Sequence, residues 1–292
     1  MKKSKYQVIV KIVELGSFAQ AAAFCNYSQS AVSKIVSTVE SELGVTLLIR
    51  THEGVRLTED GAQLFPYIRG LSNTDAALYE KASELVGIES GTIKLGTFSS
   101  ISSHILAPIL RDFKKEHPNI KFELFEGLYS DTEKWISNGT TDLGFVYMPT
   151  MKEFTTVPMF EDRMLALLPS DHPLAALDVI PLAAFENEPF IMLSGTDREV
   201  LRAFSRKHIK PDIEYVTDND YAIISMVENG LGLSILAELM LRDDNHDIVV
   251  RETEAKTSRK IGLAIKNKPH VSLAVNNFMN FLTDHISEYV PK

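Results

Sequence analysis

A single cysteine, Cys25, stands in this sequence of 292 residues, so the chain can form no disulfide within itself. Scarcity of cysteine is typical of proteins from reducing compartments. The sequence also lacks an apolar run of the roughly 18 residues that a membrane-spanning helix needs. No apolar stretch or cleavage site of an export signal follows the basic residues after Met1. We therefore expect a cytoplasmic protein without a membrane partner, in which Cys25 is a small buried hydrophobe rather than a reactive thiol.

The motifs of common enzyme classes are also missing. The eight histidines are scattered, without HExxH or any His/Cys spacing that would hold a metal ion, and neither GxSxG nor a Walker A motif occurs. Gly230-Leu231-Gly232 follows a predicted helix, which suits the end of that helix rather than a dinucleotide site. His104 stands beside a serine run, but neighbouring residues rarely face one another as a catalytic pair does. We expect no metal, no cofactor and no enzymatic activity.

Charge is distributed unevenly along the chain. The net charge is −9, yet residues 1–58 hold seven Lys and Arg against four Asp and Glu, a net charge of +3. The remaining residues hold 23 against 35, a net charge of −12. A weakly basic head on an acidic body fits a DNA-contacting head. A solvated basic face without a partner would give the same numbers.

The first 43 residues have the pattern of three short helices. Apolar spacing and break residues predict helices over 5–15, 18–25 and 28–43, with Ser17 and Ser28 as N-caps. Hydroxyl, amide and cationic side chains remain on the outer side of the third helix, and such groups can contact bases and phosphates in a major groove. The candidate DNA contacts on this helix are Ser28, Gln29, Ser30, Ser33, Lys34 and Ser37. The spacing alone fits a helix-turn-helix and a plain three-helix bundle equally well.

A small basic hairpin is predicted directly after the third helix. Two short strands, near Leu47–Thr51 and Val55–Leu57, flank a Glu53-Gly54 turn. The hairpin carries Arg50, His52 and Arg56. A hairpin of this kind beside a recognition helix is a wing that can hold phosphates or reach the minor groove, so we add these three residues to the candidate DNA contacts.

A long helix is predicted over residues 59–88. Acidic residues suit its first turn, and Pro66 is expected to bend it. One side of this helix, here called the seam, is made of mostly apolar positions that recur at alternating spacings of four and three residues, as in a coiled coil. The seam positions are Leu64, Ile68, Leu71, Asp75, Leu78, Ala82 and Leu85. The seam can pair with the chain's own body or with the same helix of a second chain.

Strand and helix patterns alternate through the rest of the chain, which predicts two α/β lobes with mostly parallel sheets. The predicted strands are Ile93–Phe98, Ile120–Phe125, Leu143–Tyr147, Met164–Leu168, Phe190–Leu193, Ile213–Thr217, Leu233–Leu236 and Ile261–Ile265. The predicted helices are Ser103–Glu116, Asp131–Asn138, Leu182–Phe185, Asp197–His208, Asp220–Asn229 and Ser272–Tyr289.

The segment from Gly16 to Gly61 resembles the N-terminal winged helix-turn-helix of LysR-type transcriptional regulators. The matching residues are Gly16-Ser17-Phe18, Ala21-Ala22, Ser28-Gln29, Ala31-Val32-Ser33, Glu40, Leu43-Gly44-Val45, Leu47, Arg50, Arg56-Leu57-Thr58 and Gly61. The body is similar more loosely, through IKLGTFSSISSHILAPILRDFKKEHPNIKFEL, TTDLGFVY, LLPSDHPLA and MVENGLGLSILAE. The resemblance implies a DNA-binding domain at 1–58, a dimerising linker helix at 59–88 and an effector-binding domain at 89–292.

In that family the effector domain is built like a periplasmic binding protein, with two lobes and a pocket between them. The resemblance places the first lobe at about 91–161 and 268–292, the second at about 162–267, and the crossings near Glu161 and Lys266. It implies effector contacts from Ser99, Ser100 and Ser102. Tyr147, Thr196 and Asp218 are further candidates, because they stand at the ends of other predicted strands and open α/β sheets place their pockets at the carboxyl ends of strands. The serine run at a helix start favours an anionic group. Ser102 or Ser103 can instead cap the helix, and for Asp218 we favour the role of a cap before Asp220.

The leading hypothesis is a transcriptional regulator whose DNA binding or bending responds to a small effector, and the serine run favours an anionic one. The resemblance implies a homodimer or homotetramer on a roughly palindromic double-stranded operator, with RNA polymerase as a further candidate partner. A solute-binding or carrier protein with a helical head is the main alternative, and the lack of an export signal argues against it. An α/β hydrolase or transferase is a third hypothesis, but it lacks a nucleophile with a placed base.

Overall fold

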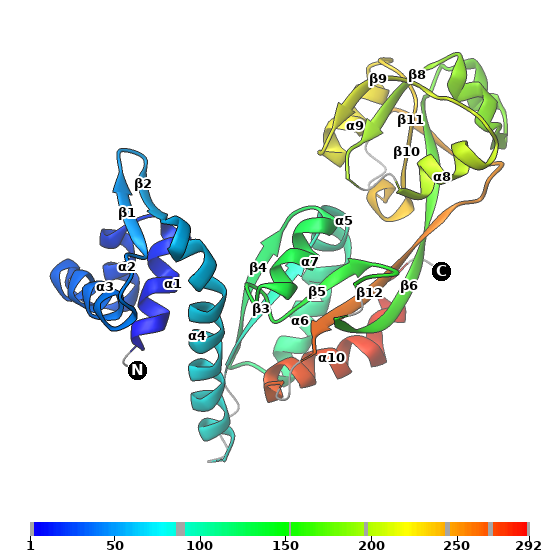
Figure 1. Cartoon of the computed structure of the whole chain (residues 1–292). Helices are drawn as coiled ribbons and strands as arrows, with labels where there is room; N and C mark the ends of the chain where they lie inside the picture. The colour runs from blue at the N-terminus through cyan, green and yellow to red at the C-terminus, as the bar shows by residue number, and fades with distance from the viewer. Residues whose placement is uncertain are drawn as a thin grey trace. The chain divides into compact units, whose positions relative to one another are not determined.

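The computed structural model describes residues 3–85, 91–151, 153–195, 198–242, 246–267 and 271–290. The chain divides into two compact units, residues 1–90 with 138–140 and residues 91–137 with 141–292 (Figure 1). None of the described helices combines the length and the apolar character that a bilayer-spanning helix needs.

The first unit begins with the predicted helices and wing. Its elements are α1 (Lys5–Leu15), α2 (Phe18–Cys25), α3 (Gln29–Leu43), β1 (Leu48–Thr51), β2 (Gly54–Leu57) and α4 (Glu59–Leu85). A serine side chain caps the start of each of the first three helices, and a residue with positive φ ends each of them. Cys25 lies in the apolar core that these helices share, and burial raises the pKa of its thiol, as expected for a small hydrophobe.

The wing is fixed to the helices through backbone contacts. The Glu40 carboxylate near the end of α3 accepts hydrogen bonds from the amides of Leu47 (2.7 Å) and Leu48 (3.2 Å), where the hairpin begins. Gly61 in α4 lies so close to this segment that a Cβ there would be 2.1 Å from the Leu47 carbonyl oxygen. The wing therefore has one position relative to α3, although it is an exposed hairpin.

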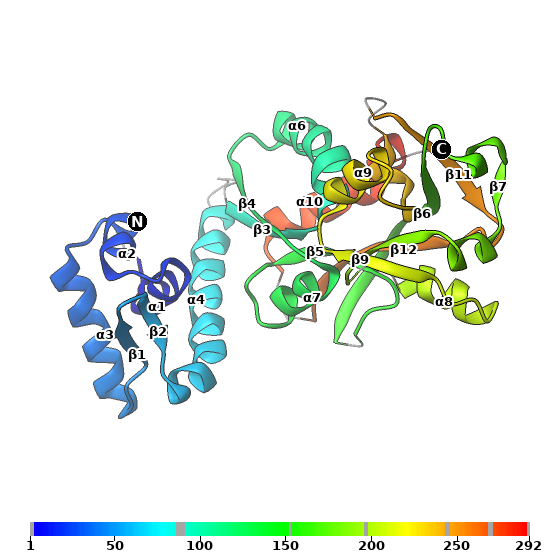
Figure 2. The same cartoon turned by 90° about the horizontal axis from the view of Figure 1, so that it is seen from above.

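The first lobe of the second unit is a sheet with helices on both faces. Its elements are β3 (Gly91–Thr97), α5 (Ser99–Ile101), a π-helical turn (Ser102–Leu106), α6 (Ala107–Glu116), β4 (Ile120–Glu126), α7 (Tyr129–Ser137), β5 (Leu143–Tyr147), β12 (Ser258–Lys266) and α10 (Leu273–His285). The strands of this sheet lie in the order β4-β3-β5-β12-β6. Helix α7 covers one face of the sheet, and α6 and α10 cover the other (Figures 1 and 2). Phe113 of α6 and Phe278 of α10 are fully buried in the core of that second face.

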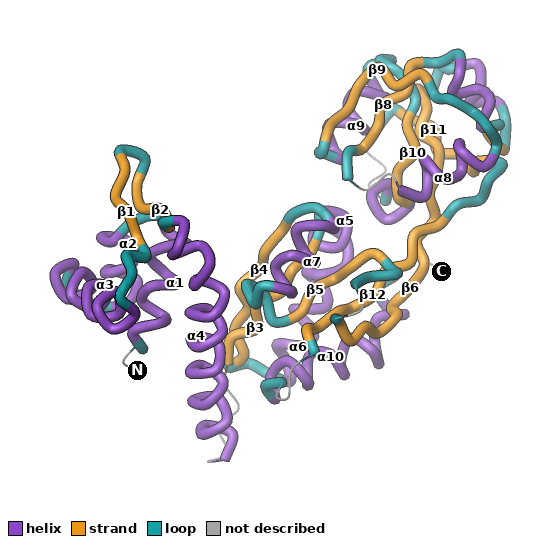
Figure 3. The backbone as a smooth tube through the Cα atoms, in the orientation of Figure 1, coloured by secondary structure: helices purple, strands orange, loops and turns teal. Residues whose placement is uncertain are grey.

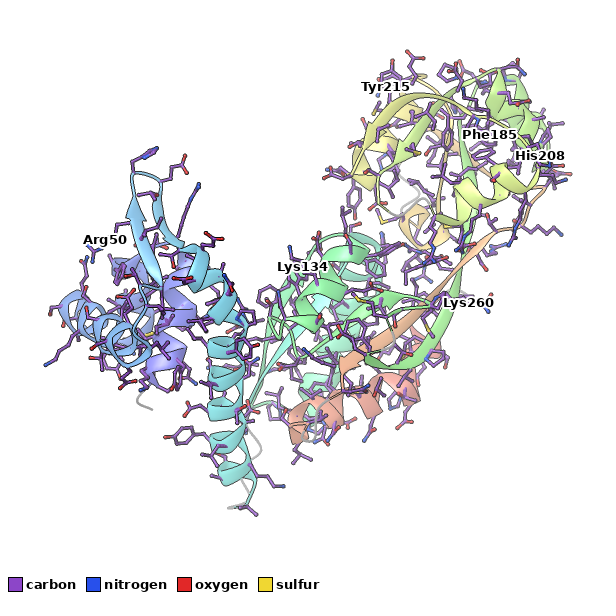
Figure 4. The ribbon with its side chains drawn as sticks, in the orientation of Figure 1. Arg50, Lys134, Phe185, His208, Tyr215 and Lys260 are labelled. Atoms are coloured by element: carbon purple, nitrogen blue, oxygen red, sulfur yellow. The ribbon has the colours of Figure 1, made fainter. Side chains whose placement is uncertain are left out.

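The second lobe has two sheets. Its elements are the last part of β6 (Phe154–Pro169), β7 (Val179–Ile180), a 3-10 helix (Leu182–Glu186), β8 (Pro189–Leu193), α8 (Arg198–Arg206), β9 (Asp212–Thr217), α9 (Asp220–Glu228), β10 (Ser234–Ala237), a 3-10 helix (Glu238–Leu241) and β11 (Ile248–Thr253). The last part of β6 pairs with β10 and β11, and β8 pairs in parallel with β9. Phe185, labelled in Figure 4, lies in the apolar core of this lobe.

Two adjacent segments carry the chain between the lobes. Residues 154–163 of β6 pair with β12 in the first lobe, and residues 164–169 pair with strands of the second (Figure 3). The first crossing therefore lies between Arg163 and Met164, two residues beyond the predicted Glu161. The chain returns at residues 254–257, where the Thr257 carbonyl accepts a hydrogen bond from the Met164 amide (2.8 Å).

Several details of the body differ from the sequence prediction. The return crossing is not near Lys266, because β12 pairs with β5 and belongs to the first lobe. The sheets are mixed rather than mostly parallel, since β12 runs antiparallel to both of its neighbours and β6 antiparallel to β10 and β11. The first half of β6 was missed because it forms the edge of the first lobe's sheet, where its partial exposure leaves a weak apolar pattern. The short β7 and the half-buried β11 were missed as well.

Candidate functional site

The outer side of α3 presents small polar groups and one cation. Gln29, Ser30, Lys34 and Ser37 are exposed, and Ser33 is half-buried. Ser28 is the N-cap: its Oγ accepts a hydrogen bond from the Ala31 amide (3.2 Å) and lies 3.0 Å from Ser30 Oγ. The side that the sequence predicted to be polar is thus uncovered within the first unit, as a helix that enters a groove must be.

Arg50 joins the wing to this helix. Figure 4 labels Arg50 beside the wing. Its guanidinium lies over the Phe18 ring, 4.4 Å from the ring centre, and its Nη2 is 3.4 Å from Ser33 Oγ. His52, at the tip, is 91% exposed in its side chain. Arg56 forms an ion pair with Glu53, which offsets part of the positive charge of the wing. Arg50 is therefore the wing cation that is already held beside α3.

A cavity of about 260 Å³ opens between the two lobes of the second unit. This volume lies just below the range of about 300–1,000 Å³ that is typical of ligand pockets, which suits a small organic molecule. The lining residues are Phe98, Ser99, Ser100, Glu126, Gly127, Leu128, Tyr129, Asp131 and Arg259 from the first lobe, and Leu193, Asp218 and Asp220 from the second.

Arg259 is the centre of the hydrogen-bond network under this cavity. Its Nε (2.9 Å) and Nη2 donate to the Asp162 carboxylate, Nη2 also donates to Ser100 Oγ (2.8 Å), and Nη1 donates to the Tyr129 hydroxyl. Asp162 also accepts a hydrogen bond from the amide of Leu239 (3.1 Å). Burial alone would lower the pKa of Arg259, but the oxygens of Tyr129 and Asp162 hold that pKa above its ordinary value. This guanidinium is charged, paired and 6% exposed.

The other charged groups of the lining are carboxylates. Asp131 is engaged with the backbone, since its Oδ2 accepts a hydrogen bond from the Leu128 amide (3.1 Å) in the first turn of α7. Asp220 accepts a hydrogen bond from Ser99 Oγ, which joins the two lobes across the cavity. Burial raises the pKa of Asp220, against the attraction of Arg259. Glu126 and Asp218 are exposed to the solvent of the cavity mouth.

The structure brings together three of the six predicted effector contacts. Ser99, Ser100 and Asp218 line the cavity. Of the residues that the structure describes, Ser102 and Tyr147 lie outside the lining: Ser102 Oγ donates to Thr97 Oγ1 (3.4 Å), and Tyr147 donates to Glu199. Thr196 lies outside the described residues.

Two capping predictions were wrong. The helical segment begins at Ser99, with Phe98 as its N-cap residue and no side-chain cap bond, so neither Ser102 nor Ser103 caps it. The cap of α9 is Asn219, whose Oδ1 accepts a hydrogen bond from the Ala222 amide (3.2 Å), so Asp218 is left for the cavity.

Five further polar lining residues were missed. Glu126 ends β4, and the rule that selected residues at the carboxyl ends of strands could have found it. Asp220, Tyr129 and Asp131 stand in the first turns of the helices after such strands. Arg259 had no signal, because it lies at the amino end of its strand. It reaches the cavity only since β12 runs antiparallel to β5.

No group of three or more His, Cys, Asp or Glu side chains within the described ranges is arranged to hold a metal ion.

Comparison with known families covers nearly all of the chain. Residues 4–62 match the family model "Bacterial regulatory helix-turn-helix protein, lysR family", and residues 87–287 match the model "LysR substrate binding domain". The HTH-type transcriptional regulator YvbU of Bacillus subtilis is 32% identical over 284 residues, which cover 96% of this chain and 97% of that protein. The alternative of a solute-binding or carrier protein finds no support in these matches.

Two solved structures share the fold. Full-length CbnR in complex with its target DNA is 18% identical, with a TM-score of 0.69 over 96% of this chain and 98% of that chain. The effector-binding domain of QuiR in complex with shikimate is 23% identical, with a TM-score of 0.63 over 69% of this chain and all of that chain.

Proposed function

The chain belongs to the LysR family of transcriptional regulators and carries the effector-binding domain of that family, and from this we propose how each unit acts. We propose that α3 and the wing bind double-stranded DNA, and that a small molecule in the cavity between the lobes modulates that binding. The observation that carries the proposal is that one chain contains both an uncovered polar helix beside Arg50 and a cavity lined by residues of two lobes.

We assign the base and backbone contacts by chemistry. Gln29, Ser30 and Ser33 carry the donors and acceptors that read base edges, while Lys34 and Arg50 neutralise phosphates. The remaining candidates are Ser28, Ser37, His52 and Arg56. CbnR, which has the same fold, has been solved with its target DNA, and this supports the same use of the head here.

We propose that the chain acts as a homo-oligomer in the cytoplasm. Leu71, Leu78 and Leu85 recur every seven residues on α4 and are 49%, 66% and 77% exposed. Such a stripe is typical of a helix that pairs with its own copy, and a dimer presents two heads to a roughly palindromic operator. RNA polymerase would be a further partner of the DNA-bound oligomer.

A ligand can change DNA binding only if it binds two arrangements of the lobes with different affinities. The Ser99–Asp220 hydrogen bond joins the two lobes at the cavity. A molecule that contacts either residue can therefore strengthen or replace a bond that holds the lobes in their relative position. The shikimate complex of QuiR supports a small-molecule role for the matching domain.

A DNA-binding assay on the region upstream of the coding sequence tests the proposal. We expect retention of that DNA, with Lys34→Ala and Arg50→Ala each weakening it and reducing the slope of log affinity against log salt by about 1. Lys5→Ala is the matched control, since it removes one cation of the same head that is already paired with Glu42. Equal losses for all three variants would contradict the assigned face, and no retention by the parent chain would overturn the proposal.

A further inference from the structure

The charge of the cavity does not match the anionic ligand that the serine run led us to expect. One cation and four carboxylates line it: Arg259 against Glu126, Asp131, Asp218 and Asp220. The question is which of these charges remain available to a ligand once the protein's own pairs are taken into account.

The positive charge is already used. The hydrogen bonds that Arg259 donates to Asp162, Ser100 and Tyr129 leave its guanidinium little donor capacity for a ligand. Asp162 is 2% exposed and holds the compensating negative charge directly beneath the lining. An anionic ligand would therefore lose its hydration without gaining an unpaired cation.

The negative charge is largely unused. Asp131 is engaged with the backbone, and Asp220 accepts a hydrogen bond from Ser99. In the part of the chain that the structure describes, no Lys or Arg forms an ion pair with Glu126, Asp218 or Asp220. These three side chains give the lining a negative potential that the guanidinium does not cancel.

The uncompensated carboxylates come from both lobes. Glu126 ends β4 of the first lobe, whereas Asp218 and Asp220 follow β9 of the second. Burial raises the pKa of Asp220, and the charge of Glu126 adds to that rise, so the two groups repel each other across the cavity. A positive charge between them would replace this repulsion by two attractions.

We propose that the cavity binds a small organic molecule with a cationic nitrogen, an amine or a guanidinium, which lies between Glu126 and the Asp218–Asp220 pair and holds the two lobes together. The proposal rests on the effector role of the cavity. It names an organic cation rather than a metal ion, because the described residues offer no cluster of three metal ligands. Ser99 and the Tyr129 ring supply the remaining contacts of a molecule of this size.

Matched probes of one carbon skeleton test the sign of the charge. We would measure the melting temperature of the full chain, and the fluorescence of Trp135, with 1,4-diaminobutane, agmatine, 1,4-butanediol, succinate and magnesium chloride at millimolar concentration. Trp135 is the one tryptophan of the sequence and lies against the loop that lines the cavity, because a Cβ on Gly127 would be 2.7 Å from its ring. We expect the amine or the guanidine to stabilise the protein and change the fluorescence, and the diol, the dianion and the metal ion to leave both unchanged.

Variants of the carboxylates locate the effect. Glu126→Gln and Asp218→Asn should each weaken binding of the cationic probe by about ten-fold or more, which is typical for the loss of one charge-assisted hydrogen bond. Two control variants remove the same charge outside the lining and should leave binding unchanged: Glu123→Gln, on the strand that Glu126 ends, and Asp212→Asn, at the start of the strand that Asp218 follows.

Three results would overturn the proposal: stabilisation by succinate, stabilisation by magnesium that depends on Glu126, or no response to either cationic probe. DNA retention is measured separately on the same variants without any probe. If the parent chain does not retain DNA, the regulatory role is refuted. The charge of the ligand is decided separately, by the probe titrations alone.

Discussion

The outer side of α3 with the wing and the cavity between the lobes use charge in opposite ways. On the head, Lys34, Arg50 and His52 are exposed, and each keeps a positive or titratable group at the surface. In the cavity the one cation, Arg259, is buried and bonded to three side chains, and the groups left over are acidic. The head can thus attract a polyanion at long range, whereas the cavity selects a small molecule by contact.

The difference extends to how substitutions should combine. Exposed groups that share no partner act almost independently, so losses on the head should add. Arg259, Asp162, Ser100 and Tyr129 form one network, so the loss of any member leaves the others with unmet hydrogen bonds and the effects should not add. Three predictions follow from this contrast between an exposed face and a buried network.

The largest effect is expected for Arg259→Met. The substitution leaves the Asp162 carboxylate buried without its cation, which costs about 3–5 kcal/mol in the free energy of unfolding. Urea unfolding of the full chain, followed by Trp135 fluorescence, would measure the loss in the lobe that holds the network. Arg163→Met is the control: that arginine pairs with two carboxylates, Glu238 and Glu252, but its side chain is 55% exposed, so we expect about 1 kcal/mol or less. Equal losses in the free energy of unfolding for the two variants would contradict the expected difference between a buried and an exposed ion pair.

An intermediate effect of opposite sign is expected for two glycines of α4. Gly61→Ala places a Cβ against the Leu47 carbonyl and should destabilise the head by about 1–3 kcal/mol, because the wing must shift. Gly70→Ala meets no atom within 4 Å and should stabilise the helix by about 1 kcal/mol. Thermal unfolding followed by circular dichroism would compare them. A stabilising Gly61→Ala would show that the wing is not fixed by this close approach.

The smallest effect is expected for Asp220→Asn without ligand. Burial raises the pKa of Asp220 above its ordinary value, so the folded chain binds this proton more tightly than the unfolded chain, and the group lowers stability as pH rises through the folded pKa. Asparagine does not ionise, and it can still accept the Ser99 hydrogen bond. At neutral pH the variant should melt about 1–3 °C higher than the parent, and below the ordinary pKa of an aspartate the difference should vanish. Scanning calorimetry at several pH values would check this, and an unchanged difference across that range would contradict it.

The head was predictable because its elements are local. Ser17 and Ser28 cap helices that begin one residue later, and the wing strands lie on either side of the Glu53-Gly54 turn, so cap, period and turn rules apply within short windows. The contacts that position the wing were not predictable, since the bonds from the Leu47 and Leu48 amides to Glu40 join a strand to a helix whose relative placement no local pattern specifies.

The cavity was predictable only in part because strand direction decides which residues reach it. Ser99 and Asp218 both follow strands and line the cavity. The resemblance pointed to Ser99, and the general rule for open α/β sheets made Asp218 a candidate. Arg259 begins a strand that enters antiparallel, and the first half of β6 is an edge strand with a weak apolar pattern. Both depend on tertiary pairing, which periodicity does not reveal.

The two crossings of the chain are neighbours, in β6 near Glu161 and at residues 254–257, and the Asp162–Arg259 pair bridges the strands at that point. A rotation of one lobe against the other turns about this narrow ribbon. Atoms near it travel a short way, while the far ends of the lobes sweep a longer arc. The cavity, which Arg259 lines, lies close to these strands, so in such a rotation a small shift at the cavity would correspond to a larger shift at the distant surfaces of the lobes.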